Sequence, residues 1–330
     1  MQITENKHRD YIYKEVINFC KKRGLIKKLK DSFLVPEEKR FHKKNIDKIG
    51  LGVLDAVHCV YDKKRTDFFI MEIEKNVSNG NIVIEAGIGT GILSFYAASL
   101  GATVYGCEIN PAVFTLANNI KDFLEKKELI PKSSVKFFLH DAITFVPPQK
   151  ADILISENIY TGMFFEYQVQ IVRHLNKYLK KQGEIIPQAM HSSVTLAQVV
   201  SDTQLKNKEL LIPSKETKTE IKSKPLSMSY VYDDINFIKI DKLQANYKNE
   251  IKTTNTGKIN AVMIQSDVKM PSGKVIKSKD TDFLNNKIYI TLNPSIEVRK
   301  GEVLNLNLSY TYGQKVKAMK ILIKKRGNPR

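Results

Sequence analysis

Residues 83–91 read Val-Ile-Glu-Ala-Gly-Ile-Gly-Thr-Gly, a short apolar run with an acid, followed by three glycines at alternate positions. The pattern predicts a strand, a tight turn and a helix that begins at about Ile92. Glycine suits such a turn because it accepts positive φ and lets a ligand approach the backbone. The amide N–H groups of the turn are expected to be unpaired donors for a polar ligand. The candidate ligand-binding residues of this segment are Glu85, Gly87, Gly89 and Gly91.

A second acid follows at the spacing that nucleotide-binding folds use. Residues 103–107 are predicted to form the next strand, and Glu108 stands at its end, 17 residues after Gly91. In such folds an acid at this place binds the ribose hydroxyls. The order of strand, glycine turn, helix, strand and acid resembles the first motifs of class I S-adenosylmethionine (SAM) methyltransferases. A glycine turn in an unrelated α/β protein is the alternative.

Composition sets the broad class of the protein. The 330 residues suffice for two domains with hydrophobic cores. No stretch approaches the roughly 18 to 20 apolar residues of a membrane span, and the polar start of the chain predicts no targeting signal. We therefore expect a cytoplasmic enzyme without membrane attachment. The three cysteines are scattered singly, which fits neither a disulfide framework nor a metal site.

The formal net charge of +18 raises the question of a nucleic-acid partner. The excess comes mainly from lysine, whereas recognition of base edges and phosphates favours the fork of arginine. Nucleic acid is therefore the less favoured partner, and the densest basic clusters are expected to be solvated surface.

The first half of the chain alternates between predicted helices and strands, as a parallel sheet requires. Three helical stretches come first, at about 10–29, 46–60 and 62–77. Strands are predicted at 82–85, 103–107, 135–139 and 152–156, and helices at 92–99, 112–126 and 165–179. Residues 1–187 are therefore predicted to form N-terminal helices and a Rossmann-like α/β domain.

The pattern changes after residues 181–187, where the alternation of helices and strands fades. Alternating apolar residues then recur at 193–199, 259–268, 287–292, 303–312 and 318–323, with turn signals between them. Residues 188–330 are therefore predicted to form a mostly antiparallel, β-barrel-like domain. The polar stretch 202–224 is the best candidate for an insertion or a mobile loop.

Two glutamates bracket the loop that follows the strand predicted at 152–156. Glu157 comes directly after that strand, and Glu166 stands nine residues later, with a glycine and several aromatic residues between them. The strand should end at the carboxyl edge of the sheet, beside the cofactor. The loop resembles the double-E loop of the protein arginine methyltransferase family, which has two glutamates at the same separation.

Further segments resemble the same family, so that the likeness runs from about Asp62 to the C-terminus. Residues 62–66 resemble its D-x-x-R-T segment, which implies that Arg65 contacts the SAM carboxylate. Residues 183–187 resemble its junction into a β-barrel substrate domain. Residues 257–261 and 298–302 are similar to segments of that barrel. The resemblance implies SAM as cofactor and a homodimer as the assembly.

The chain also departs from the family at three places. Residues 283–285, Phe-Leu-Asn, stand where the family has its T-H-W loop. Asn158 replaces the usual tryptophan after the first glutamate. The helical dimerisation arm is not obvious, unless part of 202–242 serves. These departures bear on whether peptidyl-arginine is the acceptor.

Each candidate residue has a functional reading and a structural alternative. Glu157 and Glu166 could hold a planar guanidinium by charge-assisted bonds, or Glu166 could stabilise a helix dipole while Glu157 lines the pocket. Asp141 stands where this superfamily places an acid near the adenine amino group, or it caps the following turn. Arg65 could also form an ordinary i,i+3 ion pair with Asp62.

The preferred reading is a SAM-dependent N-methyltransferase that acts on a guanidino or amino group of a protein, peptide or small molecule. The positive charge disfavours arginine-rich protein tails, which a basic surface repels. The alternatives are an RNA methyltransferase and a catalytically silent SAM-binding partner subunit.

Overall fold

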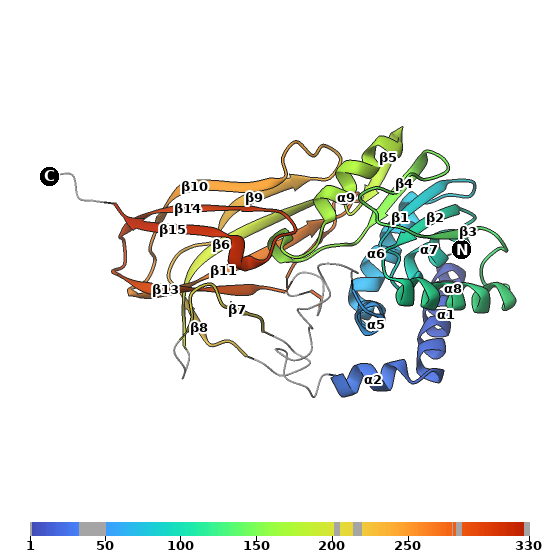
Figure 1. The fold of residues 1–330 in the computed structure, drawn as a ribbon, viewed down its shortest axis with the longest axis horizontal. Coiled ribbons are helices and arrows are strands. Elements are labelled where there is room, and N and C mark those ends of the chain that lie inside the picture. Colours follow the sequence, from blue (N-terminus) through green and yellow to red (C-terminus); the bar gives the residue numbers. More distant parts are fainter. Residues whose placement is uncertain are drawn as a thin grey trace. The chain divides into compact units, whose positions relative to one another are not determined.

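The computed structural model describes residues 2–32, 51–200, 205–213, 220–278, 280–281 and 286–326 (Figure 1). Contacts divide the chain into two compact units. The first unit comprises residues 1–158, 171–188 and 270–274, and the second comprises 159–170, 189–269 and 275–330. Residues 159–170 thus group with the second unit, although they precede the predicted boundary at residue 187. Residues 283–285 and parts of the polar stretch 202–224 lie outside the described residues.

A five-stranded sheet forms the centre of the first unit, in the order β3-β2-β1-β4-β5 (Figure 1). Its strands are β1 (Ile82–Ala86), β2 (Thr103–Glu108), β3 (Val135–Leu139), β4 (Ala151–Ser156) and β5 (Leu179–Ile186). Every pair of neighbours runs parallel. The predicted Rossmann-like α/β class is confirmed.

The strand order places a topological switch point between β1 and β4. From β1 the chain moves outward to β2 and β3, and then returns to the other side of β1 with β4. Ligands of open parallel sheets bind outside the carboxyl ends of the strands at such a point. The segments that leave these two ends begin with Gly87 and Glu157.

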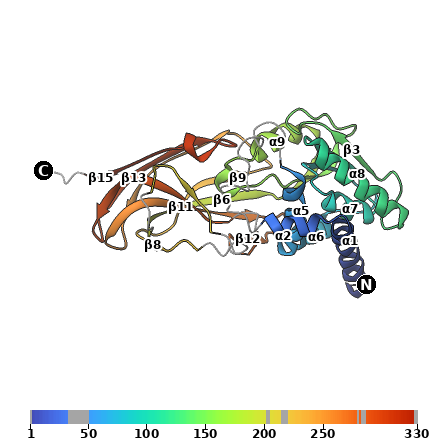
Figure 2. The ribbon, with the colours of Figure 1, turned by 60° about the horizontal axis from the view of Figure 1, so that its bottom comes forward.

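Helices join and cover these strands. They are α1 (Gln2–Lys22), α2 (Leu25–Ser32), α5 (Val53–Tyr61), α6 (Lys63–Asn76), α7 (Ile92–Ser99), α8 (Pro111–Lys126) and α9 (Gln168–Leu175). Helix α7 packs on β1 and β2, α8 packs on β2 and β3, and α1 contacts both helices (Figure 2). The helix predicted at 10–29 is divided into α1 and α2, because Gly24 turns the chain with a φ of +70°.

Local side-chain bonds set where the helices near the switch point begin. Helix α6 starts at Lys63 because the Asp62 carboxylate accepts a hydrogen bond from the Arg65 amide, at 3.2 Å. Helix α8 starts after Asn110, whose side chain accepts from the Ala112 amide at 2.9 Å. Both caps are typical helix starts, since a side-chain oxygen replaces the missing backbone partner. They fix the register of the residues that follow.

The second unit is built from two antiparallel sheets. One has seven strands with a central path β7-β13-β11-β6-β8, and the other has three in the order β10-β14-β15. Their strands are β6 (Ala189–Val199), β7 (Leu210–Leu211), β8 (Ser223–Pro225), β9 (Tyr230–Asn236), β10 (Gln244–Lys252), β11 (Gly257–Lys269), β12 (Val275–Ile276), β13 (Ile288–Val298), β14 (Val303–Thr311) and β15 (Lys320–Lys325). The predicted antiparallel, β-barrel-like class of this half is confirmed.

Alternation of apolar and polar residues explains the longest of these strands. In β14, Leu304, Leu306, Leu308 and Tyr310 are buried, and the residues between them are partly exposed. This period of two is typical of a strand with one face in a core. The chain places Tyr310 at the end of the buried row, close to the turn that follows β14.

Candidate active site

The glycine turn after β1 has left-handed backbone at all three predicted glycines. The φ angles are +72° at Gly87, +55° at Gly89 and +82° at Gly91. A Cβ at Gly87 would lie 2.5 Å from Asn158 Oδ1, and one at Gly91 would lie 2.6 Å from the Phe95 ring. At Gly89 a Cβ would lie 3.9 Å from Ala56 Cβ, an ordinary van der Waals contact, so the middle of the turn is less crowded than its two ends.

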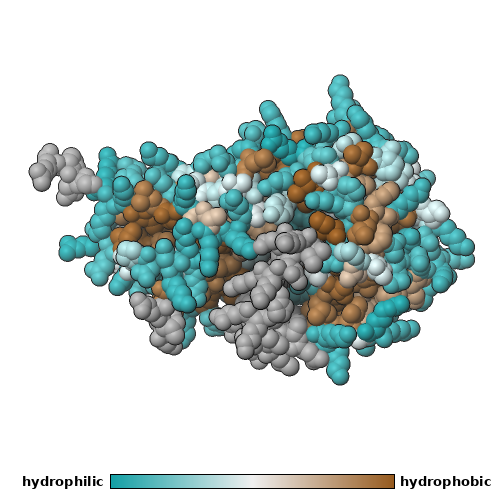
Figure 3. Space-filling view, viewed as in Figure 1, coloured by the Kyte–Doolittle hydropathy of each residue, from teal (hydrophilic) through white to brown (hydrophobic). Residues whose placement is uncertain are grey.

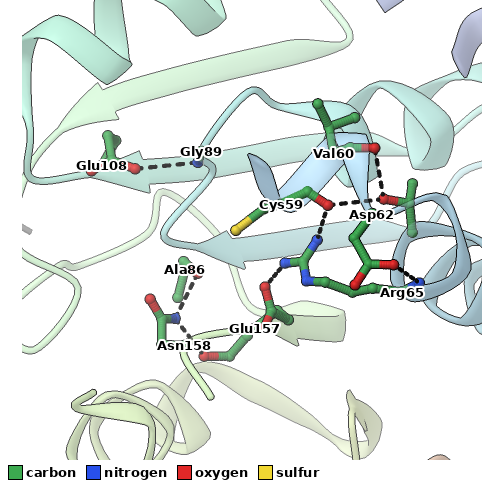
Figure 4. A network of polar contacts seen from close by, with 11 residues as sticks. Cys59, Val60, Asp62, Arg65, Ala86, Gly89, Glu108, Glu157 and Asn158 are labelled. Carbon is green, nitrogen blue, oxygen red and sulfur yellow. Dashed lines mark hydrogen bonds and ion pairs between the residues drawn. The ribbon is translucent and has the colours of Figure 1, made fainter. Parts of the chain in front are cut away.

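The expectation that the amides of this turn are unpaired was wrong for most of them. Gly87 and Ile88 donate to the Cys107 carbonyl, at 2.9 and 3.2 Å, and Gly91 donates to the Ile88 carbonyl at 2.7 Å. The Gly89 amide donates to the Glu108 carboxylate at 3.2 Å (Figure 4). The turn folds back on the end of β2, and the neighbouring strand satisfies these donors. These four amides therefore already have partners within the protein.

Two buried acids stand at the ends of β1 and β2. Glu108 accepts from the amides of Gly89 and Asn110, the latter at 3.0 Å, and burial raises its pKa. Glu85 is fully enclosed, and its carboxylate accepts a hydrogen bond from the Ser94 hydroxyl. Burial raises the pKa of Glu85 to about 8, against the lowering effects of Ser94 and the charge of Arg65. The two predicted acids therefore share one edge of the sheet with the glycine turn.

Arg65 lies in the first turn of α6 and points toward Glu157 at the end of β4 (Figure 4). The two side chains form an ion pair that is almost fully buried. One terminal nitrogen of Arg65 also donates to the Cys59 carbonyl at 3.1 Å. Its Nε is buried and has no hydrogen-bond partner among the described residues. Asp62, the alternative partner of Arg65, bonds to its backbone amide as a helix cap.

The sequence pattern identified Asn158 only as a replacement for the usual tryptophan. Its amide group donates to the Ala86 carbonyl at 2.9 Å and to Ser156 Oγ at 3.1 Å (Figure 4). These bonds tie the end of β1 to the end of β4, and the side chain lies against Gly87. The sequence signal that could have identified it is an asparagine two residues after the end of β4, one of the two strands at the switch point.

The remaining predicted residues lie apart from this cluster. Asp141 follows β3, and its Oδ1 accepts from the Ile143 amide at 2.9 Å, the capping geometry that was its structural alternative. Glu166 is half-buried in the second unit, two residues before α9 begins. The helix predicted at 165–179 thus starts later than expected, and Glu166 precedes it. Glu157 and Glu166 belong to different units.

The aromatic residues near Glu166 divide into core and surface. Phe164 is fully buried and stacks on the Tyr310 ring, with centroids 4.4 Å apart. It is therefore a core residue. Tyr160 and Phe165 are half-buried and meet edge to face, with centroids 5.0 Å apart. This second pair can present ring surface to a ligand, as can Tyr167, which is 43% exposed.

The cluster at the ends of β1, β2 and β4 fits SAM. Arg65 supplies a buried cationic group with one donor unpaired among the described residues, which suits a carboxylate. Glu108 ends β2 where a ribose would be bound. The turn is less crowded at Gly89 than at Gly87 or Gly91.

Comparison with known proteins agrees with this geometry. The family described as "Methyltransferase domain" matches residues 77–268. An uncharacterized protein of Methanocaldococcus jannaschii is 24% identical over 262 residues, which cover 79% of this chain and 93% of that protein. The "Arginine N(omega)-methyltransferase" of Streptomyces achromogenes is 28% identical over 130 residues, 39% of this chain and 36% of that enzyme.

The same fold occurs in a solved structure. The Trypanosoma brucei PRMT1 enzyme–prozyme heterotetrameric complex with AdoHcy matches with a TM-score of 0.61 and 13% identity, over 82% of this chain and 96% of that one. No helix in the described part of the present chain is long and apolar enough to cross a membrane. The chain belongs to the methyltransferase family: it is a class I SAM-dependent enzyme with SAM as cofactor, divergent from the protein arginine methyltransferases that it resembles.

Proposed function

We propose that the enzyme methylates a guanidino or amino nitrogen and that Glu157 orients this nitrogen. The observation that supports the proposal most is the buried pair of Arg65 and Glu157 at the switch point of the sheet. A carboxylate in that place would accept N–H bonds from a cationic acceptor. Fixed by Arg65 on one side, it would hold the acceptor in a single orientation.

SAM would supply a methyl group from its sulfonium: the lone pair of the acceptor nitrogen would form the N–CH3 bond, the electron pair of the broken S–CH3 bond would stay on sulfur, and the nitrogen would release one proton to water. The chain's own residues would supply alignment. Arg65 contacts Oε2 of Glu157, which leaves the other oxygen for the acceptor. By resemblance to the double-E loop, Glu166 contacts the same acceptor. Positioning of this kind can provide a large part of the rate enhancement.

Four groups of residues would hold the cofactor. Arg65 would bind its carboxylate through the nitrogen that lacks a partner among the described residues. Glu85 and the glycine turn of residues 87–91 would line the methionine end, and Glu108 would bind the ribose hydroxyls. Asp141 would accept from the adenine amino group with Oδ2, since its Oδ1 already accepts from an amide. Residues 1–187 would thus bind SAM, and 188–330 would serve acceptor binding and dimerisation.

The acceptor that we favour is a small molecule or a peptide with a guanidino group. The Streptomyces relative is named as an arginine N(omega)-methyltransferase. The net charge of +18 would repel arginine-rich protein tails. Tyr160 and Phe165 offer ring surface close in sequence to Glu166, where a guanidinium gains from cation–π contact.

Two other functions are kept because a specific observation favours each. The net charge of +18 favours an RNA methyltransferase. The Trypanosoma brucei complex contains a prozyme, and a silent SAM-binding partner subunit would be comparable to it. We further propose that the protein is a homodimer and acts in the cytoplasm.

The test uses purified protein, methyl-labelled SAM and a soluble cell extract separated into protein, nucleic-acid and small-molecule fractions. Label in the protein or small-molecule fraction, abolished in Glu157→Gln with SAM binding retained, is the expected result. Asp152→Asn is the control: it removes the charge of an ion pair between β4 and Lys180 of β5, and the amide oxygen can still accept from the Ile82 backbone. Label in RNA, or full turnover by Glu157→Gln, would contradict the proposal. SAM binding without label in any fraction would identify a silent subunit.

A further inference from the structure

The loop that carries Glu166 has an unusual backbone. Gly162, Met163 and Phe165 all have left-handed φ angles, of +67°, +56° and +64°. Non-glycine residues adopt this conformation rarely, and it persists only where the surroundings enforce it. Such strain is typical of segments that must hold a side chain in one place. The groups that enforce it should therefore be found around the loop.

One set of restraints comes from the turn after β14, in the same unit. The Gly313 amide donates to the Met163 carbonyl at 2.8 Å, and the Phe165 amide donates to the Gln314 carbonyl at 3.2 Å. These bonds hold the residues on either side of Phe164, whose ring is stacked on Tyr310. Main-chain hydrogen bonds, which do not depend on side-chain identity, thus restrain Met163 and Phe165.

The second set consists of side chains and depends on sequence. The Gly162 amide donates to Ser266 Oγ at 2.9 Å, and Ser266 Oγ lies 2.9 Å from Ser192 Oγ. Ser266 and Ser192 thus form one hydroxyl pair, which ends on the Gly162 amide. The Tyr232 hydroxyl lies 2.8 Å from the Tyr310 hydroxyl, which donates to the Gly162 carbonyl at 2.6 Å. Two buried hydroxyl pairs therefore meet on the backbone of Gly162, one at its amide and one at its carbonyl.

The Gly162 carbonyl fixes the direction of the bond between the two tyrosines. A hydroxyl has one proton, and Tyr310 uses its proton on the Gly162 carbonyl, so Tyr232 must donate to Tyr310. Between Ser192 and Ser266 either hydroxyl can be the donor. We call these four side chains the hydroxyl circuit. Each is at most 5% exposed, and burial raises the pKa of Tyr310 well above 10, which keeps its proton in place.

Gly162 is matched to this circuit by shape as well as by hydrogen bonds. A Cβ at this position would lie 2.7 Å from the Phe164 ring and 3.0 Å from the Tyr232 hydroxyl. Because the circuit is buried, loss of one hydroxyl would leave its neighbours without a partner or water. Both hydroxyl pairs of the circuit end on Gly162, so their effect falls on the loop between Glu157 and Glu166.

We propose that Ser266, Ser192, Tyr232 and Tyr310 are positioning residues that fix the Gly162 backbone and thereby hold Glu166 in its working position. The functional half of this proposal rests on the role proposed above for Glu166. The four residues touch neither acceptor nor cofactor. They act through the loop, so that their loss should weaken acceptor binding and turnover while leaving SAM affinity unchanged.

The test compares Tyr310→Phe and Tyr232→Phe with Tyr289→Phe in the full chain. Tyr289 is the matched control, because it is 1% exposed and its hydroxyl, 2.8 Å from Ser223, lies outside the circuit. Hydrogen exchange of the peptide covering 159–170 is measured with SAM affinity and with label transfer to L-arginine and to an arginine-containing peptide. We expect exchange about tenfold faster, and kcat/KM about tenfold lower through a raised acceptor KM, in both circuit variants only.

The outcomes separate the circuit from the proposed reaction. Equal exchange and equal kcat/KM in the circuit variants and in Tyr289→Phe would overturn the circuit. Faster exchange at 159–170 with no transfer to either probe by the unaltered enzyme would support the circuit and count against the proposed acceptor class. If Tyr310→Phe does not fold, Tyr232→Phe and Ser266→Ala decide, because both break the circuit and leave the stacked Tyr310 ring in place.

Discussion

At the scale of single residues, the Arg65 side chain makes contacts in several directions. It pairs with Glu157, donates to Cys59 and has a buried Nε without a partner among the described residues. Lysine cannot replace it, because an ammonium lacks the planar fork with donors in several directions. Arg65→Lys should lower SAM affinity and methyl transfer by at least about tenfold each.

Calorimetric titration with SAM and a transfer assay would measure both effects. Arg173→Lys serves as control, since Arg173 is exposed on α9. An Arg65→Lys enzyme with unaltered SAM affinity would show that the buried cation serves the fold and not the cofactor.

Glu85 should make stability depend on pH. Burial raises its pKa from 4.5 to about 8, so the folded protein keeps a proton that the unfolded chain releases. This contribution to stability is complete below pH 4.5 and is lost as pH rises from 4.5 through about 8. Glu85→Gln mimics the protonated form and keeps a partner for Ser94. Thermal melts across this range should therefore show the variant gaining in Tm relative to the parent as pH rises. A constant difference in Tm would contradict the assignment.

The residues proposed to bind SAM at the carboxyl edge of the sheet were predictable, because the sequence patterns that identify them are local. The glycines and Glu108 follow from a strand, a turn and a spacing, and all lie at one edge of the sheet. Asn158 was not predictable in this way, because its role depends on Ala86, 72 positions away. For Asp141, the motif did not distinguish a cofactor contact from a structural role, since its Oδ1 already caps a local turn.

At the scale of elements, the turn between β1 and α7 should tolerate no side chain at Gly91. Its φ is +82°, and a Cβ would lie 2.6 Å from the Phe95 ring, inside the helix that the turn begins. Gly91→Ala combines backbone strain of about 1 kcal/mol or more with a steric clash in a close-packed region. We expect an unfolding free energy lower by about 2 to 4 kcal/mol and a loss of SAM binding.

Gly273→Ala measures the backbone strain of a left-handed alanine without a steric clash. Gly273 has a φ of +83°, and a Cβ there would meet no atom within 4 Å. Urea unfolding of both variants gives the two free energies, and their difference reports the packing around Phe95. Equal losses in the two variants would show that the contact with Phe95 relaxes without cost.

Strands were predictable where burial alternates and not where charge interrupts it. The pattern over 303–312 matches β14, whose inward residues are apolar. Strand β10 reads Gln-Ala-Asn-Tyr-Lys-Asn-Glu-Ile-Lys, and the polar Asn249 interrupts the alternation on the face that buries Ala245 and Ile251. Strand β9 contains the buried Asp233, which pairs with Lys242 at 2.7 Å. Pairing with β14 and β6 forms these strands, and sequence patterns do not show such long-range partners.

At the scale of the whole molecule, charge is the property that should select acceptors. The chain has 53 basic and 35 acidic residues, and hydrophilic residues cover most of the face in Figure 3, with separate hydrophobic patches. A surface field of this sign concentrates anionic partners and repels cationic ones over a range of about 10 Å at 0.1 M salt. Peptides with one arginine between acidic residues should therefore be methylated with a higher kcat/KM than peptides with the same arginine between lysines.

The ionic strength distinguishes this effect from contacts within the site. Raising the salt from about 0.05 to about 0.5 M shortens the screening length severalfold, so the preference for acidic flanks should shrink toward unity. L-arginine has no flanking residues, and the charges of its α-carboxylate and α-ammonium cancel, so its kcat/KM should change less than that of either peptide. A preference for acidic flanks that persists at high salt would mean that specific contacts in the site recognise the flanking residues. A preference for the lysine-flanked peptide would show that the lysine excess lies away from the path of the acceptor.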